Sequence, residues 1–325
     1  MRNLLRPLLI SIASISLVLT ACGGEEASVA DGPATIVVTT NILGDVVEVI
    51  VGDQANVETI MPLGSDPHVF QASAQQVDLM MNADLVVANG ESFEEGILDV
   101  LNAAKDDGVT FFEAMDHVRA IEFAADGGHD DHDDHDDHDD HAGHDHSGTD
   151  PHFFTDPVKM IMVVEALVDS LIANVDGLDA EAIKANGASY VEDLETVNEE
   201  LKAMFAALSS EQRVLVTNHQ VFGYFALQYD FAVVGTVIPS SSTLDSTSAK
   251  ELAELVEVIK ENNVKAIFGD VAASDVLAQT LAAEVGDMKV VPLFTESLGA
   301  TDTDAATYLG MLRANGKLIS DSLSG

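Results

Sequence analysis

Short apolar runs typical of buried β-strands alternate with helix-like segments in two separate parts of the chain, and this order restricts the fold more than any other feature. Helix-like segments such as 42–50, 248–262 and 275–285 separate the runs. Strands in this alternation form parallel sheets that helices cover on both faces. We therefore expect an α/β fold with two Rossmann-like lobes. The strand-like runs are 35–39, 57–61, 83–88, 109–112, 213–217, 232–235, 264–268 and 289–293.

A long stretch without strand signals separates the two parts of the chain. Within it, Tyr190, Leu194, Val197 and Leu201 are spaced as one face of a helix that covers 179–208. A long rigid helix that joins two lobes is the simplest interpretation of this pattern. The hydrophobic content of 47% is sufficient for a sizeable core. The expected segments are an N-terminal α/β lobe at 35–156, a helical connector at 157–208 and a C-terminal α/β lobe at 209–325.

The first residues have the layout of a secretory signal peptide. Arg2 and Arg6 precede an apolar segment, 8–19, that is too short to span a bilayer. The sequence LTAC then ends at Cys22 and resembles a bacterial lipobox, in which the cysteine carries the lipid. We expect a signal peptide at 1–21 and a lipidated tether at 22–34. This predicts an extracytoplasmic protein, in the periplasm or at the cell surface, that is membrane-anchored through Cys22.

Cysteine usage and charge restrict the function. Cys22 is the only cysteine, so the mature chain can have neither an internal disulfide nor a cysteine zinc site. Any metal must be held by His, Asp or Glu. The formal net charge of −42 repels nucleic acid and favours cations, and we expect no nucleic-acid partner.

A histidine- and aspartate-rich segment, 127–148, reads GGHDDHDDHDDHDDHAGHDHSG. It contains almost nothing apolar, which predicts a disordered surface loop. Imidazole and carboxylate groups at this density bind Zn²⁺ and similar cations, so we expect a low-affinity metal collector. An acidic loop with incidental histidines is the alternative, and the strict His-Asp-Asp repeat argues against it. The histidines are His129, His132, His135, His138, His141, His144 and His146.

Three of the remaining histidines have settings typical of ligands. His68 and His152 each end an Asp-Pro-His phrase, in which the proline restricts the backbone just before the imidazole. His219 directly follows a predicted strand, and ligands collect outside the carboxyl ends of strands in open α/β sheets. All three side chains could meet in a cleft between the lobes. His117 has no such setting and is expected to be an ordinary surface or core residue.

These phrases and their order resemble those of the cluster A-I ABC-transporter substrate-binding lipoproteins, which serve zinc and manganese uptake. The resemblance covers 35–324 and is closest to the zinc receptors with a histidine-rich loop. It rests on GSDPH at 64–68, ADLVVANG at 83–90 with Glu94 after it, DPH at 150–152, TNH at 217–219 with FGY at 222–224, and IF at 267–268 before Asp270. It implies two α/β lobes joined by one long helix, with the metal held between them. It also implies a monomer that works with a membrane permease and a cytoplasmic ATPase.

Carried over by position, the resemblance implies that His68, His152, His219 and Glu296 are the metal ligands. The carboxylate position is usually an aspartate, so Asp302 and Asp304 are alternatives to Glu296. Asp270 is expected to be structural. Three imidazoles and one carboxylate suit tetrahedral Zn²⁺, whereas Mn²⁺ prefers more oxygen ligands. The expected function is an extracytoplasmic receptor that captures Zn²⁺ and delivers it to an ABC permease for high-affinity uptake.

Three alternatives stay open at this point. The first is a manganese or other divalent-metal receptor of the same family. The second is a zinc hydrolase or lyase, although no His-Glu-x-x-His pair is present and Glu296 would occupy the position that a catalytic water needs. The third is a passive surface zinc buffer or adhesin. We expect a protein that is not an enzyme. Its metal affinity should decrease when the pH is lowered past roughly 6.5, the pKa of free imidazole.

Overall fold

The computed structural model describes residues 32–122, 148–286 and 288–324. The predicted signal peptide, Cys22 and the seven loop histidines lie outside these residues. Within the described residues, each of the eight predicted strands corresponds to a strand of the structure. By their contacts, residues Pro33–Gly325 belong to one compact unit.

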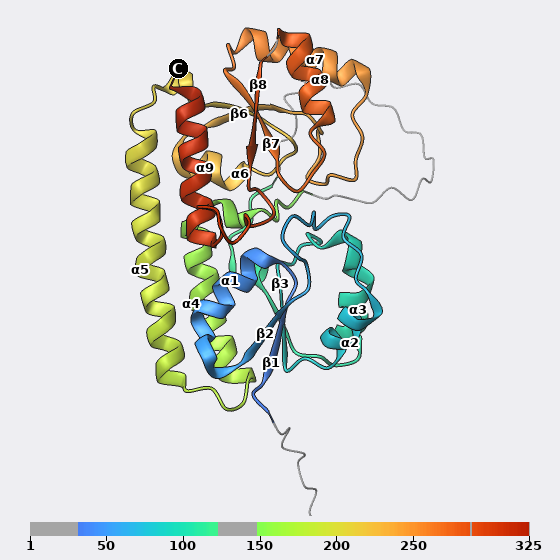
Figure 1. Cartoon of the computed structure of the whole chain (residues 1–325), viewed down its shortest axis with the longest axis vertical. Helices are drawn as coiled ribbons and strands as arrows, with labels where there is room; N and C mark the ends of the chain where they lie inside the picture. Colours follow the sequence, from blue (N-terminus) through green and yellow to red (C-terminus); the bar gives the residue numbers. More distant parts are fainter. Residues whose placement is uncertain (1–31, 123–147, 287, 325) are drawn as a thin grey trace, which may run out of the picture. The chain divides into compact units, whose positions relative to one another are not determined.

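Two four-stranded parallel sheets form the two lobes (Figure 1). The sheet of the first lobe has the order β2-β1-β3-β4, and that of the second has the order β6-β5-β7-β8. In both sheets the strand order reverses beside the first strand, and this is where open α/β sheets bind ligands. The strands are β1 (Thr35–Val38), β2 (Asn56–Thr59), β3 (Leu85–Ala88), β4 (Phe111–Glu113), β5 (Val214–Thr217), β6 (Ala232–Thr236), β7 (Ala266–Asp270) and β8 (Lys289–Leu293).

Several of the helices that cover the sheets begin at a capping residue. Thr40 caps α1, and Ser248 forms a capping box with Glu251 at the start of α7. These caps satisfy backbone N–H groups that the first helical turn leaves without partners. The helices of the lobes are α1 (Asn41–Val51), α2 (Ala74–Met81), α3 (Leu98–Asp106), α6 (Gly223–Tyr229), α7 (Ala249–Glu261), α8 (Val276–Val285) and α9 (Tyr308–Leu323).

Two long helices occupy the stretch that was predicted to lack strands. They are α4 (Pro157–Asn174) and α5 (Ala180–Phe205). Figure 1 shows that α5 runs alongside both lobes. The four residues predicted to share one helical face of α5 are all buried. A Cβ atom at Gly187 would lie 2.4 Å from Cγ2 of Val168, so the glycine permits α4 and α5 to pack closely.

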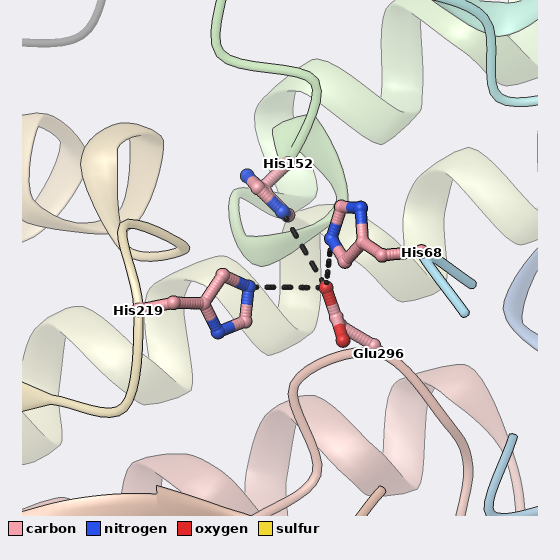
Figure 2. A group of neighbouring side chains, drawn as sticks. All are labelled: His68, His152, His219 and Glu296. Carbon is pink, nitrogen blue, oxygen red and sulfur yellow. Dashed lines mark hydrogen bonds and ion pairs between the residues drawn. The ribbon is translucent and has the colours of Figure 1, made fainter. Parts of the chain in front are cut away.

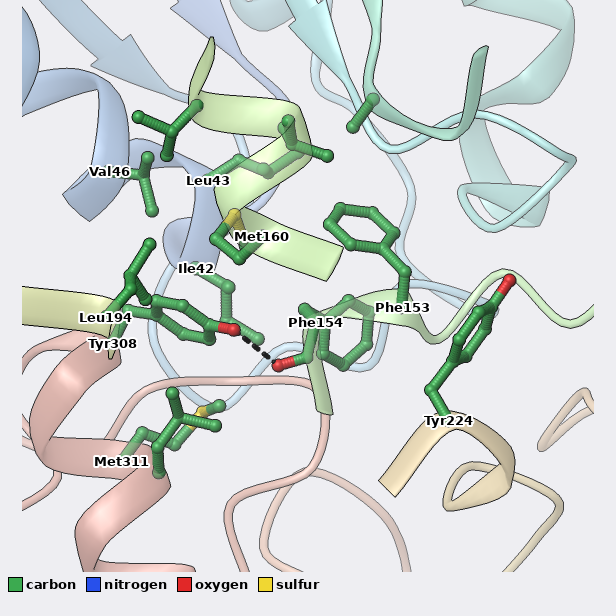
Figure 3. Close-up of a cluster of buried hydrophobic side chains, with 14 of the residues drawn as sticks. Ile42, Leu43, Val46, Phe153, Phe154, Met160, Leu194, Tyr224, Tyr308 and Met311 are labelled. Atoms are coloured by element: carbon green, nitrogen blue, oxygen red, sulfur yellow. Dashed lines mark hydrogen bonds between the residues drawn. The ribbon is translucent and has the colours of Figure 1, made fainter. Parts of the chain in front are cut away.

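The largest hydrophobic cluster runs through both lobes and the helices between them. It includes Ile36 of β1, Leu194 of α5 and Leu293 of β8. Figure 3 shows its centre, where the Tyr308 hydroxyl donates a hydrogen bond to the Phe154 carbonyl oxygen at 2.7 Å. The lobes are therefore joined by continuous packing as well as by the chain. No helix in the described part of the chain has the length and apolar character needed to cross a membrane.

Candidate metal site

Four side chains from distant parts of the sequence meet at one point. Figure 2 shows the imidazoles of His68, His152 and His219 directed at the carboxylate of Glu296. The Nε2 atoms lie 2.9, 3.5 and 3.1 Å, respectively, from Glu296 Oε1. Each of the four residues is at most 2% exposed. The structure thus brings together all four residues named from the resemblance.

The spacing of these atoms is close to that of a tetrahedral metal site. Bonds of 2.0–2.1 Å to a central Zn²⁺ place any two ligand atoms about 3.3 Å apart. The three nitrogen-to-oxygen distances of 2.9–3.5 Å bracket this value. No two ligand atoms are more than 4.8 Å apart, so the widest pairs must approach by roughly 1 to 1.5 Å to share one ion.

The two Asp-Pro-His phrases form the same local turn. The backbone N–H of His68 donates to Asp66 Oδ1 at 2.9 Å, and the N–H of His152 donates to Asp150 Oδ1 at 2.9 Å. Asp150 makes a further bond, because its Oδ1 also lies 2.8 Å from His152 Nδ1. A carboxylate on one ring nitrogen orients the imidazole and leaves the other nitrogen to a metal.

Asp150 is itself held by the second lobe. The Tyr224 hydroxyl donates to the Asp150 carbonyl oxygen at 2.9 Å and accepts from the backbone N–H of Ile121 at 3.3 Å. A Cβ atom at Gly223 would lie 2.2 Å from Asp150 Oδ2. Glycine at the start of α6 therefore lets the second lobe approach the aspartate that orients His152.

The charges of the site depend strongly on one another. Burial opposes charge on His152, but its hydrogen bond to Asp150 and the nearby Glu296 carboxylate raise its pKa to about 9. Burial likewise opposes charge on His68, yet the Glu296 carboxylate raises its pKa. Burial outweighs Glu296 at His219 and lowers that pKa. Although burial acts against it, the nearby histidines hold the pKa of Glu296 well below its usual range. The metal-free site therefore keeps an ionised carboxylate and a proton on His152.

The buried polar atoms of the site that lack hydrogen-bond partners among the described residues include Nδ1 of His219 and Oε2 of Glu296. A buried carboxylate oxygen without a partner carries a desolvation cost that a bound cation removes. The Glu296 carboxylate could therefore offer a cation either one oxygen or both.

Aromatic rings form one wall of the site. The ring of Phe93 meets His68 and His152 edge to face, with centroids 5.4 and 5.5 Å away. Phe93 follows Glu91 and Ser92, which both have positive φ, at 49° and 59°. Such backbone is uncommon and energetically costly for residues other than glycine.

A buried carboxylate fixes the turn that carries Phe93. Glu94 accepts hydrogen bonds from the backbone N–H groups of Asn89 at 2.7 Å and Gly90 at 3.3 Å. It also accepts from the Thr39 hydroxyl at 2.6 Å. Three donors on one carboxylate hold the turn in its strained form.

The second lobe also closes over the site through two hydroxyl groups. They belong to the segment between β6 and α7. Ser242 donates to Glu95 Oε2 at 2.7 Å, and Thr243 donates to Asp66 Oδ2 at 2.6 Å. Asp66 also accepts from the backbone N–H of His68, so this contact connects the second lobe to the segment that carries a site histidine.

The other residues considered from sequence lie outside the cluster. His117 is exposed and stacks on Phe112, with ring centroids 4.8 Å apart. Asp302 and Asp304 are exposed. Asp270 accepts from the backbone N–H of Ala272 and from the Thr295 hydroxyl, and burial raises its pKa to about 7. Its position beside the Glu296 segment agrees with a structural role.

Sequence reasoning missed the residues that support the four side chains. The repeated Asp-Pro-His phrase contained a signal for Asp66 and Asp150, since an aspartate two residues before a histidine can accept from its backbone. Nothing in the sequence marked Phe93, Ser242 or Thr243.

The sequence matches the profile of ZnuA, described as the zinc-uptake complex component A, periplasmic, over residues 36–322. The chain belongs to this family. Members of the family are periplasmic solute-binding proteins and not enzymes, so the hydrolase and lyase alternative is set aside.

Relatives within the family carry names for two metals. The zinc-binding lipoprotein AdcA of Streptococcus pneumoniae is 32% identical over 306 residues, which is 94% of this chain and 58% of AdcA. The chain thus spans little more than half the length of that relative. The manganese-binding lipoprotein MntA of Bacillus subtilis is 27% identical over 97% of this chain and 98% of its own.

Solved structures share the fold. The periplasmic zinc-binding protein TroA of Treponema pallidum superposes with a TM-score of 0.77 over 90% of this chain and 99% of its own, at 24% identity. A manganese-bound periplasmic metal-binding protein of Candidatus Liberibacter asiaticus has a TM-score of 0.73 at 23% identity, covering 89% of this chain and 99% of its own. At these identities the likeness concerns the fold alone.

Proposed function

We propose that this protein captures Zn²⁺ with His68, His152, His219 and Glu296 and delivers it to an ABC permease. The observation that carries the proposal is the buried set of three imidazole nitrogens around one carboxylate oxygen, at separations close to the edges of a zinc tetrahedron. The four ligand atoms come from both lobes. Capture of the ion therefore fixes the lobes together, and a partner that separates them releases it.

Manganese is the second candidate, because family relatives are named for both metals. Mn²⁺ prefers more oxygen ligands than the single carboxylate of this cluster offers. The unpartnered Oε2 of Glu296 could supply a second oxygen, which leaves five protein donors for a larger ion. The nitrogen-rich donor set nevertheless favours Zn²⁺.

Calorimetric titration with Zn²⁺ and Mn²⁺ tests this function. The sample is the mature chain without lipid, in which the seven loop histidines are replaced by asparagine so that the cluster is measured alone. One tight Zn²⁺ site is expected, and His219→Ala should abolish it. His117→Ala is the matched control, because it removes an exposed histidine outside the cluster and should leave binding unchanged. If Mn²⁺ binds more tightly than Zn²⁺, the protein is a manganese receptor instead of a zinc receptor.

The histidine-rich segment is proposed as an accessory collector, and the passive buffer is its rival. The two differ in what the loss of one cluster ligand does in cells. A receptor with His68→Ala loses zinc-dependent growth at limiting zinc, whereas a buffer keeps most of its capacity because the loop histidines remain. Growth that is unaffected by His68→Ala would favour the buffer.

Attachment through a lipid at Cys22 and cooperation with a permease and an ATPase complete the proposal. The relatives AdcA and MntA are named lipoproteins, and this agrees with the lipobox-like sequence before Cys22. Mass spectrometry of the membrane-bound protein should find a diacylglyceryl group on Cys22. Cys22→Ser should move the protein into the soluble fraction, and retention of that variant at the membrane would contradict the anchor.

A further inference from the structure

One buried amide joins the two segments that carry His68 and Glu296. Asn41 is the first residue of α1 and is 8% exposed. Its Nδ2 donates to the carbonyl oxygens of Met61 at 3.4 Å and Pro62 at 3.3 Å, in the segment that leads to His68. Its Oδ1 accepts from the backbone N–H of Leu298 at 2.8 Å, two residues after Glu296.

Ser297 makes the same connection from the other side. It directly follows Glu296 and is fully buried. Its hydroxyl oxygen accepts from the backbone N–H of Gly64 at 2.7 Å and from Asn41 Nδ2 at 3.2 Å. The backbone after Glu296 is thus tied to the first lobe by side chains and main chain together.

The backbone before Glu296 is tied to a different element. Asn315 of α9 accepts from the N–H of Phe294 at 2.9 Å and donates to the Phe294 carbonyl oxygen at 2.7 Å. The Glu296 segment is therefore held at both ends. Of the two attachments, the one through Asn41 crosses between the lobes and sets the place of Glu296 relative to His68.

We propose that Asn41, together with Ser297, is a positioning residue for the metal ligand Glu296. The proposal rests on the proposed metal-binding function of the cluster. Asn41 touches no ligand atom, and it acts by holding the segment whose carboxylate must reach three histidines. Without the amide, the 297–298 backbone loses the bond at Leu298 and keeps the one from Gly64 to Ser297, so Glu296 Oε1 is held less firmly within 2.9–3.5 Å of the three Nε2 atoms. Partners that orient metal ligands change affinity roughly 10- to 100-fold when they are removed.

A thermodynamic cycle on the full mature chain separates positioning from general destabilisation. Zn²⁺ affinity is measured by competition with a chelator for the wild type, Asn41→Ala, Glu296→Ala and the double variant. We expect Asn41→Ala to weaken binding roughly 10- to 100-fold in the wild type. In the Glu296→Ala background it should change affinity less than about threefold, since the ligand that it positions is already gone. An equal loss in both backgrounds would overturn the proposal.

The control is a buried asparagine of similar exposure elsewhere. Asn198 is 6% exposed and accepts from Gln228 Nε2 at 2.9 Å and from the Tyr229 hydroxyl at 3.2 Å. Asn198→Ala should lower the melting temperature but leave Zn²⁺ affinity within about threefold of wild type. If the Asn41→Ala variant does not fold, the Ser297→Ala variant takes its place in the cycle. Ser297→Ala is the milder change, because it removes only a hydroxyl group.

The two proposals fail in different ways. A wild-type chain without a tight metal site contradicts the proposed function, and this inference fails with it. A tight wild-type site that survives both Asn41→Ala and Ser297→Ala contradicts the positioning role alone. If the tight ion is Mn²⁺, the same cycle is measured with Mn²⁺ and the same limits apply.

Discussion

His152 and Asp150 are linked twice, because Asp150 Oδ1 accepts from both the backbone N–H and the ring Nδ1 of His152, at 2.9 and 2.8 Å. The backbone bond fixes the turn and the ring bond fixes the imidazole. The arrangement leaves Nε2 of His152 directed at Glu296, 3.5 Å away. The three-residue segment 150–152 thus leaves Nε2 of His152 as the ring nitrogen that is available to a metal.

Asp150→Asn should weaken Zn²⁺ binding roughly tenfold. Asparagine keeps an oxygen for the backbone N–H but removes the charge that orients the ring and increases its basicity. The pKa of His152 should fall at the same time, since the hydrogen bond to Asp150 is the largest influence that raises it. NMR titration of the metal-free protein measures that pKa, and chelator competition measures the affinity. Unchanged values for both quantities would show that Asp150 has no orienting role.

Zinc binding at pH 7.5 should release at least about one proton, because His152 carries a proton and the pKa of His68 is also raised. The pKa of His152 is about 9 in the metal-free site, so the ring is charged at this pH and must become neutral to bind. The affinity should then rise up to about tenfold per pH unit as far as pH 9. The sequence alone suggested a change near pH 6.5, and the contacts of His152 move it upward. Calorimetry in buffers of different ionisation enthalpy counts the protons, and a count of zero would contradict the charged state.

Asp156→Asn should stabilise the protein at neutral pH. Asp156 caps α4 by accepting from the N–H of Val158 at 2.8 Å, and asparagine can make the same bond. Burial raises the pKa of Asp156 to about 6, although Val158 and Lys159 lower it. A carboxyl group whose pKa is raised on folding binds more protons when folded, so stability falls as pH rises from about 4 to about 6.

The gain from Asp156→Asn should therefore be complete at pH 7.5, at about 1–3 kcal/mol, and should vanish near pH 4. Denaturant unfolding of both proteins at the two pH values measures this difference. A stabilisation that does not depend on pH would show that the charge of Asp156 has no part in it.

Gly187→Ala should destabilise the contact between α4 and α5. The added methyl group would lie 2.4 Å from Val168 Cγ2, and overpacking of this kind costs about 1–3 kcal/mol, partly offset by the better helix propensity of alanine. Thermal unfolding should show a lower melting temperature, and Val168→Ala in the same chain should restore part of the loss. Ser189→Ala, at an exposed position of α5, is the control. Equal effects of the two α5 variants would contradict the close contact.

The parts of the fold that were predictable depend on local patterns. Apolar β-branched runs predicted all eight strands in the described residues, because a strand buried on both faces needs apolar side chains throughout. The face formed by Tyr190, Leu194, Val197 and Leu201 predicted α5 for the same kind of reason. Glycine is unfavourable inside a helix, and the reason for Gly187 in α5 is visible only with Val168 beside it.

The parts that were not predictable depend on contacts between distant residues. Asn41 and Ser297 are 256 positions apart, and neither has a composition or spacing that suggests a partner. The raised pKa of His152 depends on Asp150, which is close in sequence, and on Glu296, which is not. Residue types suggested which side chains could bind a metal. The orientation and charge of those side chains follow from the packing of the two lobes.

The near-complete burial of the four side chains also affects rates. Water reaches at most 2% of the surface of His68, His152, His219 or Glu296, so a chelator in solution cannot form a mixed complex with an ion at this point. Exchange must wait until the lobes part, and its rate should level off as the chelator concentration rises. The residence time of the ion is then set by the rate at which the two lobes separate. Two proteins with equal affinity could hold the ion for very different times.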